Sequence, residues 1–98
     1  MWSMGVMMNK AIKLIIHGKV QGVGYRRWFE KQALELELTG YVKNLAGGEV
    51  EAIIVGTENQ LHTIIERSYM GPSRAEVSKI IQSEFEQAAD FVTFQMLR

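Results

Sequence analysis

Residues 10–38, KAIKLIIHGKVQGVGYRRWFEKQALELEL, change their hydrophobic period partway along, and this change decides the fold. In residues 10–18 the apolar side chains recur mainly at every second position, which predicts a strand buried on one side. In residues 26–38 they recur at spacings of three and four, with charged residues between them, which predicts an amphipathic helix. A glycine-rich connection joins the two segments. The stretch therefore predicts a strand, a loop and a helix in succession.

The remaining sequence alternates strand patterns with one further helix pattern. Residues 39–56 hold two apolar runs around Ala-Gly-Gly, which predicts a β-hairpin. Residues 57–70 open with Thr57 and carry Gln60 three positions later, a capping box that predicts the start of a second helix. Gly71-Pro72 is expected to end that helix. Two more strands are predicted, in residues 75–85 and 90–97.

In the later of these strands we expect Val92, Phe94 and Met96 on one face. In the earlier one we expect simple alternation, with Val77, Lys79 and Ile81 on one face and Ser78 and Ile80 on the other.

The element order is thus β-α-β-β-α-β-β. Two helices that are each apolar on one face fit an α+β ferredoxin-like sandwich, with both helices on one face of a mostly antiparallel sheet. The length of 98 residues suits one domain, which we place at residues 10–98. Residues 1–9 are expected to be a poorly ordered extension. Because this fold hosts many unrelated activities, it does not by itself indicate a function.

The composition excludes several classes of function. There are 11 acidic and 11 basic residues, and this balance disfavours a general nucleic-acid or membrane binder. The chain has no cysteine, which excludes disulfides, thiol nucleophiles and thiolate metal sites. Its two histidines, His17 and His62, form no metal-spacing motif. No run is long enough to span a bilayer or resembles a signal peptide, so we expect a cytoplasmic protein.

The connection after the first strand has the chemistry of a small-anion site. Its glycines permit positive φ and close approach of the backbone, so that consecutive N–H groups can converge on an anion. The first turn of the following helix adds unpaired N–H groups, and Arg26 can place a fork of donors over the same point. The alternative is a tight strand–helix connection that simply needs glycine. In the same way, Asn44 taken alone is most simply a turn residue.

Two extended motifs resemble those of the acylphosphatase family. Residues 18–26, GKVQGVGYR, follow the family pattern G-x-V-Q-G-V-x-F-R with tyrosine in place of phenylalanine. Residues 40–50, GYVKNLAGGEV, follow the pattern G-aromatic-V-x-N-x-x-x-G-x-V throughout. Residues 70–77, MGPSRAEV, are similar to a third family stretch, with Ser73 in place of a proline. The resemblance covers about residues 11–98.

This resemblance implies hydrolysis of acyl phosphates, with inorganic phosphate as product and inhibitor. The family's catalytic arginine and asparagine fall on Arg26 and Asn44. The phosphate would be held by the 19–26 loop through the backbone N–H groups of Val20, Gln21, Gly22, Val23, Gly24 and Tyr25. No metal and no cofactor are implied, because Arg26 and the loop supply the positive potential. We expect a monomer that binds neither nucleic acid nor membranes.

Two positions depart from the family pattern. We expect the added hydroxyl of Tyr25 to lie at the surface without a chemical role. Glu37 stands where many members have glycine, at the end of the first helix, where a left-handed residue is easiest to accommodate. Arg27 follows Arg26 directly, and successive side chains of a helix point about 100° apart. Arg27 is therefore expected to point away from the site and to be a surface residue.

The same scaffold can serve two other functions. A non-catalytic small-anion-binding or regulatory module would need the loop but would not need a water-positioning amide. An RNA-binding domain would need aromatic residues on its central strands for stacking on bases. The strand GEVEAIIVG, residues 48–56, has none.

Overall fold

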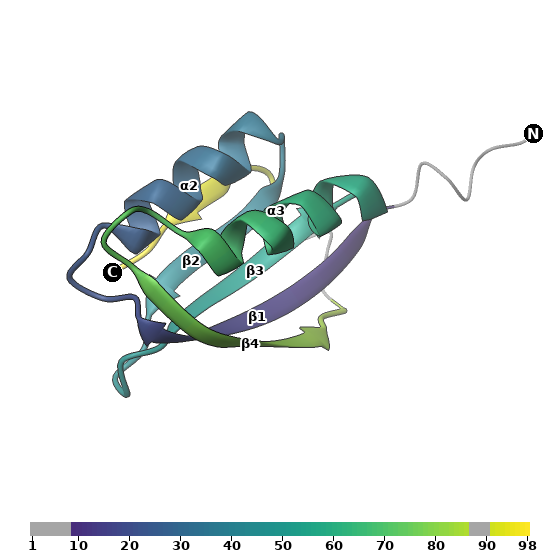
Figure 1. Ribbon diagram of the computed structural model, residues 1–98. Coiled ribbons are helices and arrows are strands. Elements are labelled where there is room, and N and C mark those ends of the chain that lie inside the picture. Colours follow the sequence, from purple (N-terminus) through teal and green to yellow (C-terminus); the bar gives the residue numbers. More distant parts are fainter. Residues whose placement is uncertain (1–8, 87–90) are drawn as a thin grey trace, which may run out of the picture.

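A computed structural model describes residues 9–86 and 91–98 (Figure 1). Residues 1–8 of the predicted extension lie outside the described residues. The described elements follow the predicted order: β1 (Lys10–Lys19), α2 (Tyr25–Glu35), β2 (Thr39–Asn44), β3 (Val50–Gly56), α3 (Glu58–Met70), β4 (Glu76–Glu84) and β5 (Phe94–Met96).

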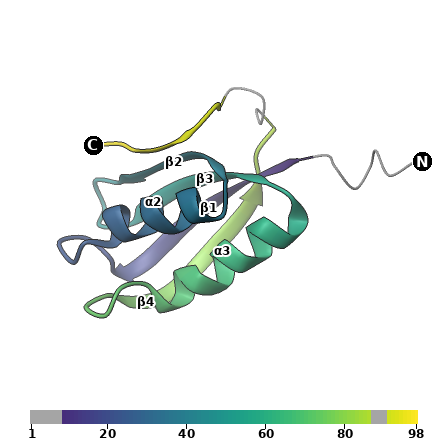
Figure 2. The same ribbon diagram turned by 90° about the horizontal axis from the view of Figure 1, so that it is seen from above.

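The five strands form one sheet in the order β4-β1-β3-β2-β5. All neighbours are antiparallel except β2 and β5, which are parallel. Figures 1 and 2 show both helices on the same face of this sheet, so the predicted ferredoxin-like α+β fold is confirmed. Because β1 and β2 are each antiparallel to β3, they run in the same direction, and β5 runs with them. The carboxyl ends of these three strands therefore meet at one edge of the sheet.

The main core lies between the helices and the sheet. It includes Leu14, Ile16, Phe29, Ile54 and Ile64, none of which has measurable exposure. These residues come from the alternating positions of the central strands and from one stripe of each helix, as the hydrophobic periods predicted. A smaller cluster covers part of the opposite face of the sheet and contains Ala11, Ile53 and Val55.

Glu37 ends helix α2 in the left-handed conformation, with φ 61°. The N–H of Glu37 donates to Leu34 O at 3.1 Å, and the N–H of Leu38 donates to Ala33 O at 2.9 Å. This pair of bonds is the Schellman arrangement, in which the position of Glu37 is the one that favours glycine. Helix α2 therefore ends at Glu35, three residues before the predicted end at 38.

The alternation expected in β4 is wrong. The register shifts between His17 and Gly18, which pair with Lys79 and Val77, so Ser78 is an extra residue in a β-bulge. The bulge turns Val77 toward the same core as Ile80, and Ile81 is half exposed.

The face expected for the last strand is only partly right. Strand β5 begins at Phe94, which is buried, and Met96 packs against the core. Val92 lies before the strand and is 92% exposed. Only residues 94–96 pair with β2 and follow the alternation of the sheet. The strand predicted from the sequence pattern, residues 90–97, was therefore too long.

Candidate active site

A cavity of about 180 Å³ lies at the sheet edge where β1, β2 and β5 end. The loop after β1 forms one wall, the first turn of α2 follows it, and the ends of β2 and β5 complete the lining. The strand directions explain this meeting, since parallel strands end at a common edge. The lining residues are Val20, Gln21, Gly22, Gly24, Tyr25, Arg26, Arg27, Asn44 and Met96.

The loop backbone has the conformation that the anion-site hypothesis requires. Gly22 has φ 75° and Gly24 has φ 80°, a region that residues with a Cβ rarely adopt. At both positions a Cβ would meet nothing within 4 Å, so no neighbouring protein atom forces glycine here. Gly24 is also the N-cap of α2, whose first N–H groups have no partners within the helix. The cavity thus lies against unpaired N–H groups and the positive end of the helix dipole.

Arg26 lies in the first turn of α2 and lines the cavity. One Nη1 proton is donated to the carbonyl oxygen of Leu97 at 2.6 Å. This bond comes from the segment that follows β5, so residues distant in sequence fix the direction of the guanidinium. A guanidinium has five N–H donors, which leaves others for an anion.

Asn44 is the last residue of β2 and lines the same cavity as Arg26. Its Oδ1 is buried and has no hydrogen-bond partner among the residues that the structure describes. A buried amide oxygen without a partner is uncommon in native proteins and calls for an explanation. Asn44 also lines the polar cavity, so its carboxamide is the polar group that β2 presents there.

Gln21 joins the loop to the β2–β3 turn. Its Nε2 donates to Leu45 O and to Glu49 O, each at 2.8 Å. Leu45 follows Asn44 directly, so this side chain connects the anion loop with the residue that carries the amide. The sequence predicted a role for the backbone N–H of Gln21 in the loop, but not this role of its side chain.

The surface position expected for the Tyr25 hydroxyl is wrong. Tyr25 is 1% exposed, and its hydroxyl donates to Ser68 O at 2.7 Å within the core. In a continuous helix, Ser68 O would accept from residue 72, but that residue is Pro72 and has no N–H. The tyrosine therefore satisfies a carbonyl at the end of α3. Burial raises the pKa of the Tyr25 hydroxyl far above its ordinary value, which keeps it protonated.

The structure brings together most of the residues predicted for the site. Among the loop residues, Val23 does not line the cavity, and its side chain packs against the core. Arg27 is exposed as expected, yet it also lines the cavity. Met96 also lines the cavity, although no sequence motif marked it as a site residue. Knowledge that the last strand pairs in parallel with β2 would have placed it there, since Met96 pairs with Val42.

The site is positively charged. Its lining includes Arg26 and Arg27 and, within the part of the chain that the structure describes, no carboxylate. Neither described helix is long and apolar enough to cross a membrane. Residues 9–86 and 91–98 contain no group of three or more acidic, histidine or cysteine side chains that could hold a metal ion. The residues present thus suit a small phosphate-like anion.

Fold and site together define a ferredoxin-like protein with an anion-binding loop between β1 and α2. Residues 12–96 match the family model described as Acylphosphatase. An acylphosphatase of Acaryochloris marina is 45% identical over 87 residues, which are 89% of this chain and 92% of that protein. One of Rhizobium etli is 44% identical over 72 residues, 74% of this chain and 77% of that protein. The chain belongs to the acylphosphatase family.

Solved structures agree with this membership. An acylphosphatase from Coxiella burnetii has a TM-score of 0.86 at 36% identity, covering 92% of this chain and 94% of that one. The crystal structure of acylphosphatase from Bacillus subtilis has a TM-score of 0.87 at 31% identity, covering 93% and 100%.

Proposed function

We propose that this chain hydrolyses acyl phosphates, with Arg26 and Asn44 as its catalytic residues. The observation that supports the assignment is that the arginine and the asparagine line one cavity with the glycine loop. The backbone N–H groups of residues 20–25 bind the phosphoryl oxygens together with Arg26. These preorganised donors stabilise the charge on those oxygens in the transition state.

The leaving group explains why no general acid is needed. An acyl phosphate is a mixed anhydride, and cleavage of its bridging P–O bond releases a carboxylate, which is a weak base. A carboxylate departs without a proton. Positioning and charge stabilisation therefore account for the catalysis of phosphoryl transfer.

Asn44 orients the attacking water. Its carboxamide lines the cavity, forms a hydrogen bond with that water and holds it in line with the bond that breaks. An amide is too weak a base to deprotonate water, so a phosphoryl oxygen takes the proton. The water oxygen bonds to phosphorus as the bridging P–O bond breaks, and the products are a carboxylate and dihydrogen phosphate, which leaves the loop.

Two substitutions separate the two roles. Arg26→Ala is expected to lower kcat/KM at least about 10²–10³-fold, the loss typical of one preorganised donor, and to weaken phosphate binding. Asn44→Ala is expected to lower kcat roughly a hundredfold with nearly unchanged phosphate affinity, because it removes only the positioning of water. Asn59→Ala, an exposed asparagine on α3, is the matched control.

The assay follows benzoyl phosphate by its ultraviolet absorbance, with inorganic phosphate as competitor. Loss of phosphate binding with normal turnover in Asn44→Ala would contradict the assigned roles. Phosphate binding without any hydrolysis by the unsubstituted chain would favour the non-catalytic anion-binding module.

We further propose that the chain acts as a cytoplasmic monomer. Every residue of the proposed site comes from a single chain, so no partner copy is needed to complete it. Sedimentation at assay concentration tests this, and a dimer that loses activity on dilution would contradict it.

A further inference from the structure

The side chain of Gln21 has a role in the site that differs from binding the anion. Its Nε2 donates to Leu45 O and to Glu49 O. A primary amide has two N–H donors, so both are used by these carbonyls and neither is left for a phosphoryl oxygen. The remaining Oε1 is an acceptor and does not suit an anion. Any effect of this side chain on the reaction is therefore indirect.

The two carbonyls stand where the β2–β3 hairpin closes. Asn44 and Val50 form the last pair of its ladder. Leu45 and Glu49 lie just outside that pair, and the N–H of Leu45 donates to Glu49 O at 2.8 Å. The amide of Gln21 thus holds both arms of the hairpin beside Asn44. Figure 1 shows the β2–β3 turn and the loop before α2 at the same end of the molecule.

The loop and the hairpin are otherwise separate. In the part of the chain that the structure describes, no other hydrogen bond joins residues 20–24 to the hairpin. The pairing of β1 with β3 ends at Ile16, before the loop begins. The loop is held to α2 instead, since Gly24 O accepts from the N–H of Trp28 at 3.0 Å. Gln21 therefore sets the position of the hairpin end relative to the loop.

The carboxamide of Asn44 depends on this connection. Its Oδ1 has no hydrogen-bond partner among the described residues, so no bond to that oxygen orients the side chain. The position of the carboxamide follows from the backbone at the end of β2, directly before Leu45. A misplacement of about 1 Å can cost about 10²-fold in rate. We propose that Gln21 is a positioning residue, which acts through Asn44 by holding it at the correct distance from the phosphate loop. This inference rests on the proposed function.

The test measures the hydrolysis of benzoyl phosphate by Gln21→Met in two backgrounds. Methionine has a similar length but no donor. In the otherwise unsubstituted chain, kcat is expected to fall about tenfold, because the water is held less well in line. Inhibition by inorganic phosphate should change less than about twofold, since the loop and Arg26 stay together on α2. In the Asn44→Ala background the same substitution should change kcat less than about twofold, because the residue through which it acts is absent.

The variant is expected to fold, because each carbonyl keeps a backbone donor. Leu45 O still accepts from the N–H of Gly48 at 3.2 Å, and Glu49 O still accepts from Leu45. Circular dichroism and Tm check this. Gln21→Ala leaves room for water to bond to the two carbonyls and should show the same kinetic pattern.

Gln32→Met is the matched control. Gln32 is also partly buried, and its Oε1 accepts from Arg67 Nη1 at 2.7 Å, which joins α2 to α3. This glutamine does not line the cavity, so the control should lower Tm and leave kcat unchanged.

Three outcomes would overturn the inference. They are an unchanged kcat in Gln21→Met, an equal fall of kcat in the Asn44→Ala background or in Gln32→Met, and a loss of phosphate affinity as large as the loss of kcat. Failure of the unsubstituted chain to hydrolyse benzoyl phosphate would instead overturn the proposed function.

Discussion

Replacement of Tyr25 by phenylalanine tests the connection between α2 and α3. The substitution removes the hydroxyl that donates to Ser68 O, a carbonyl for which Pro72 offers no N–H. An acceptor left unsatisfied in the core costs about 1–3 kcal/mol. The ring itself stays in place, since it packs between Trp28 and Phe29 at centroid distances of 5.4 and 6.2 Å. We therefore expect the free energy of unfolding to fall by about 1–2 kcal/mol, in the lower part of the range for an unsatisfied acceptor.

For a chain of this length the entropy of unfolding is about 0.2 kcal/mol per degree, so Tm should fall by about 5–10 °C. Thermal and urea unfolding followed by circular dichroism measure the change. Tyr69→Phe, whose residue is half exposed and adjacent to Ser68, should change stability by less than about 0.5 kcal/mol. An equal Tm for Tyr25→Phe and the unsubstituted chain would show that Ser68 O does not depend on this hydroxyl, and the reasoning would be refuted.

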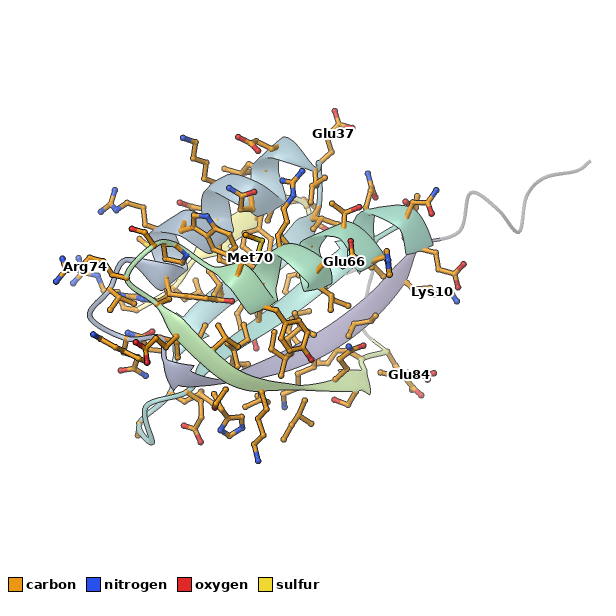
Figure 3. The ribbon with its side chains drawn as sticks, viewed as in Figure 1. Lys10, Glu37, Glu66, Met70, Arg74 and Glu84 are labelled. Atoms are coloured by element: carbon orange, nitrogen blue, oxygen red, sulfur yellow. The ribbon has the colours of Figure 1, made fainter. Side chains whose placement is uncertain are left out.

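Two further outcomes concern stability. Glu37→Gly should be neutral or stabilise the protein by up to about 1 kcal/mol, because glycine adopts φ 61° without strain. Figure 3 shows the Glu37 side chain pointing away from the molecule. A clear drop in Tm would contradict this expectation. The free energy of unfolding should decrease as pH rises above about 10. Burial raises the pKa of the Tyr25 hydroxyl far above its ordinary value. Burial and the neighbouring Glu51 raise the pKa of the Tyr41 hydroxyl to about 12. Between pH 9 and 11 both hydroxyls keep their protons in the folded state, whereas the unfolded chain begins to lose them. The free energy of unfolding measured by urea titration should therefore fall less from pH 9 to pH 11 in Tyr41→Phe than in the unsubstituted chain.

The sequence predicted the fold well because the hydrophobic period and the capping signals act locally. The period of two in residues 10–18 and the capping box at Thr57 both correspond to described elements. The errors arose where pairing with another strand decides the outcome. The bulge at Ser78 depends on the register of β4 against β1, and that register leaves no mark on the periodicity of β4 alone.

The site was predictable to a similar extent. Arg26, Asn44 and the loop glycines were found because they stand in two spaced motifs, and the structure places them around one cavity. Met96 and the carbonyl of Leu97 were not found, since their position depends on the parallel pairing of β5 with β2. The buried hydroxyl of Tyr25 was missed because its acceptor lies 43 residues further along the chain.

The bulge at Ser78 also has a consequence for the behaviour of the protein at high concentration. Strand β4 is an outer strand of the sheet, and a long regular outer strand can recruit the same strand of another molecule into an extended sheet. The extra residue interrupts the even row of outward N–H and C=O groups, and the exposed charges of Glu76, Lys79 and Glu84 lie along the same strand. Edge-to-edge growth into fibrils is thereby opposed on this side of the molecule.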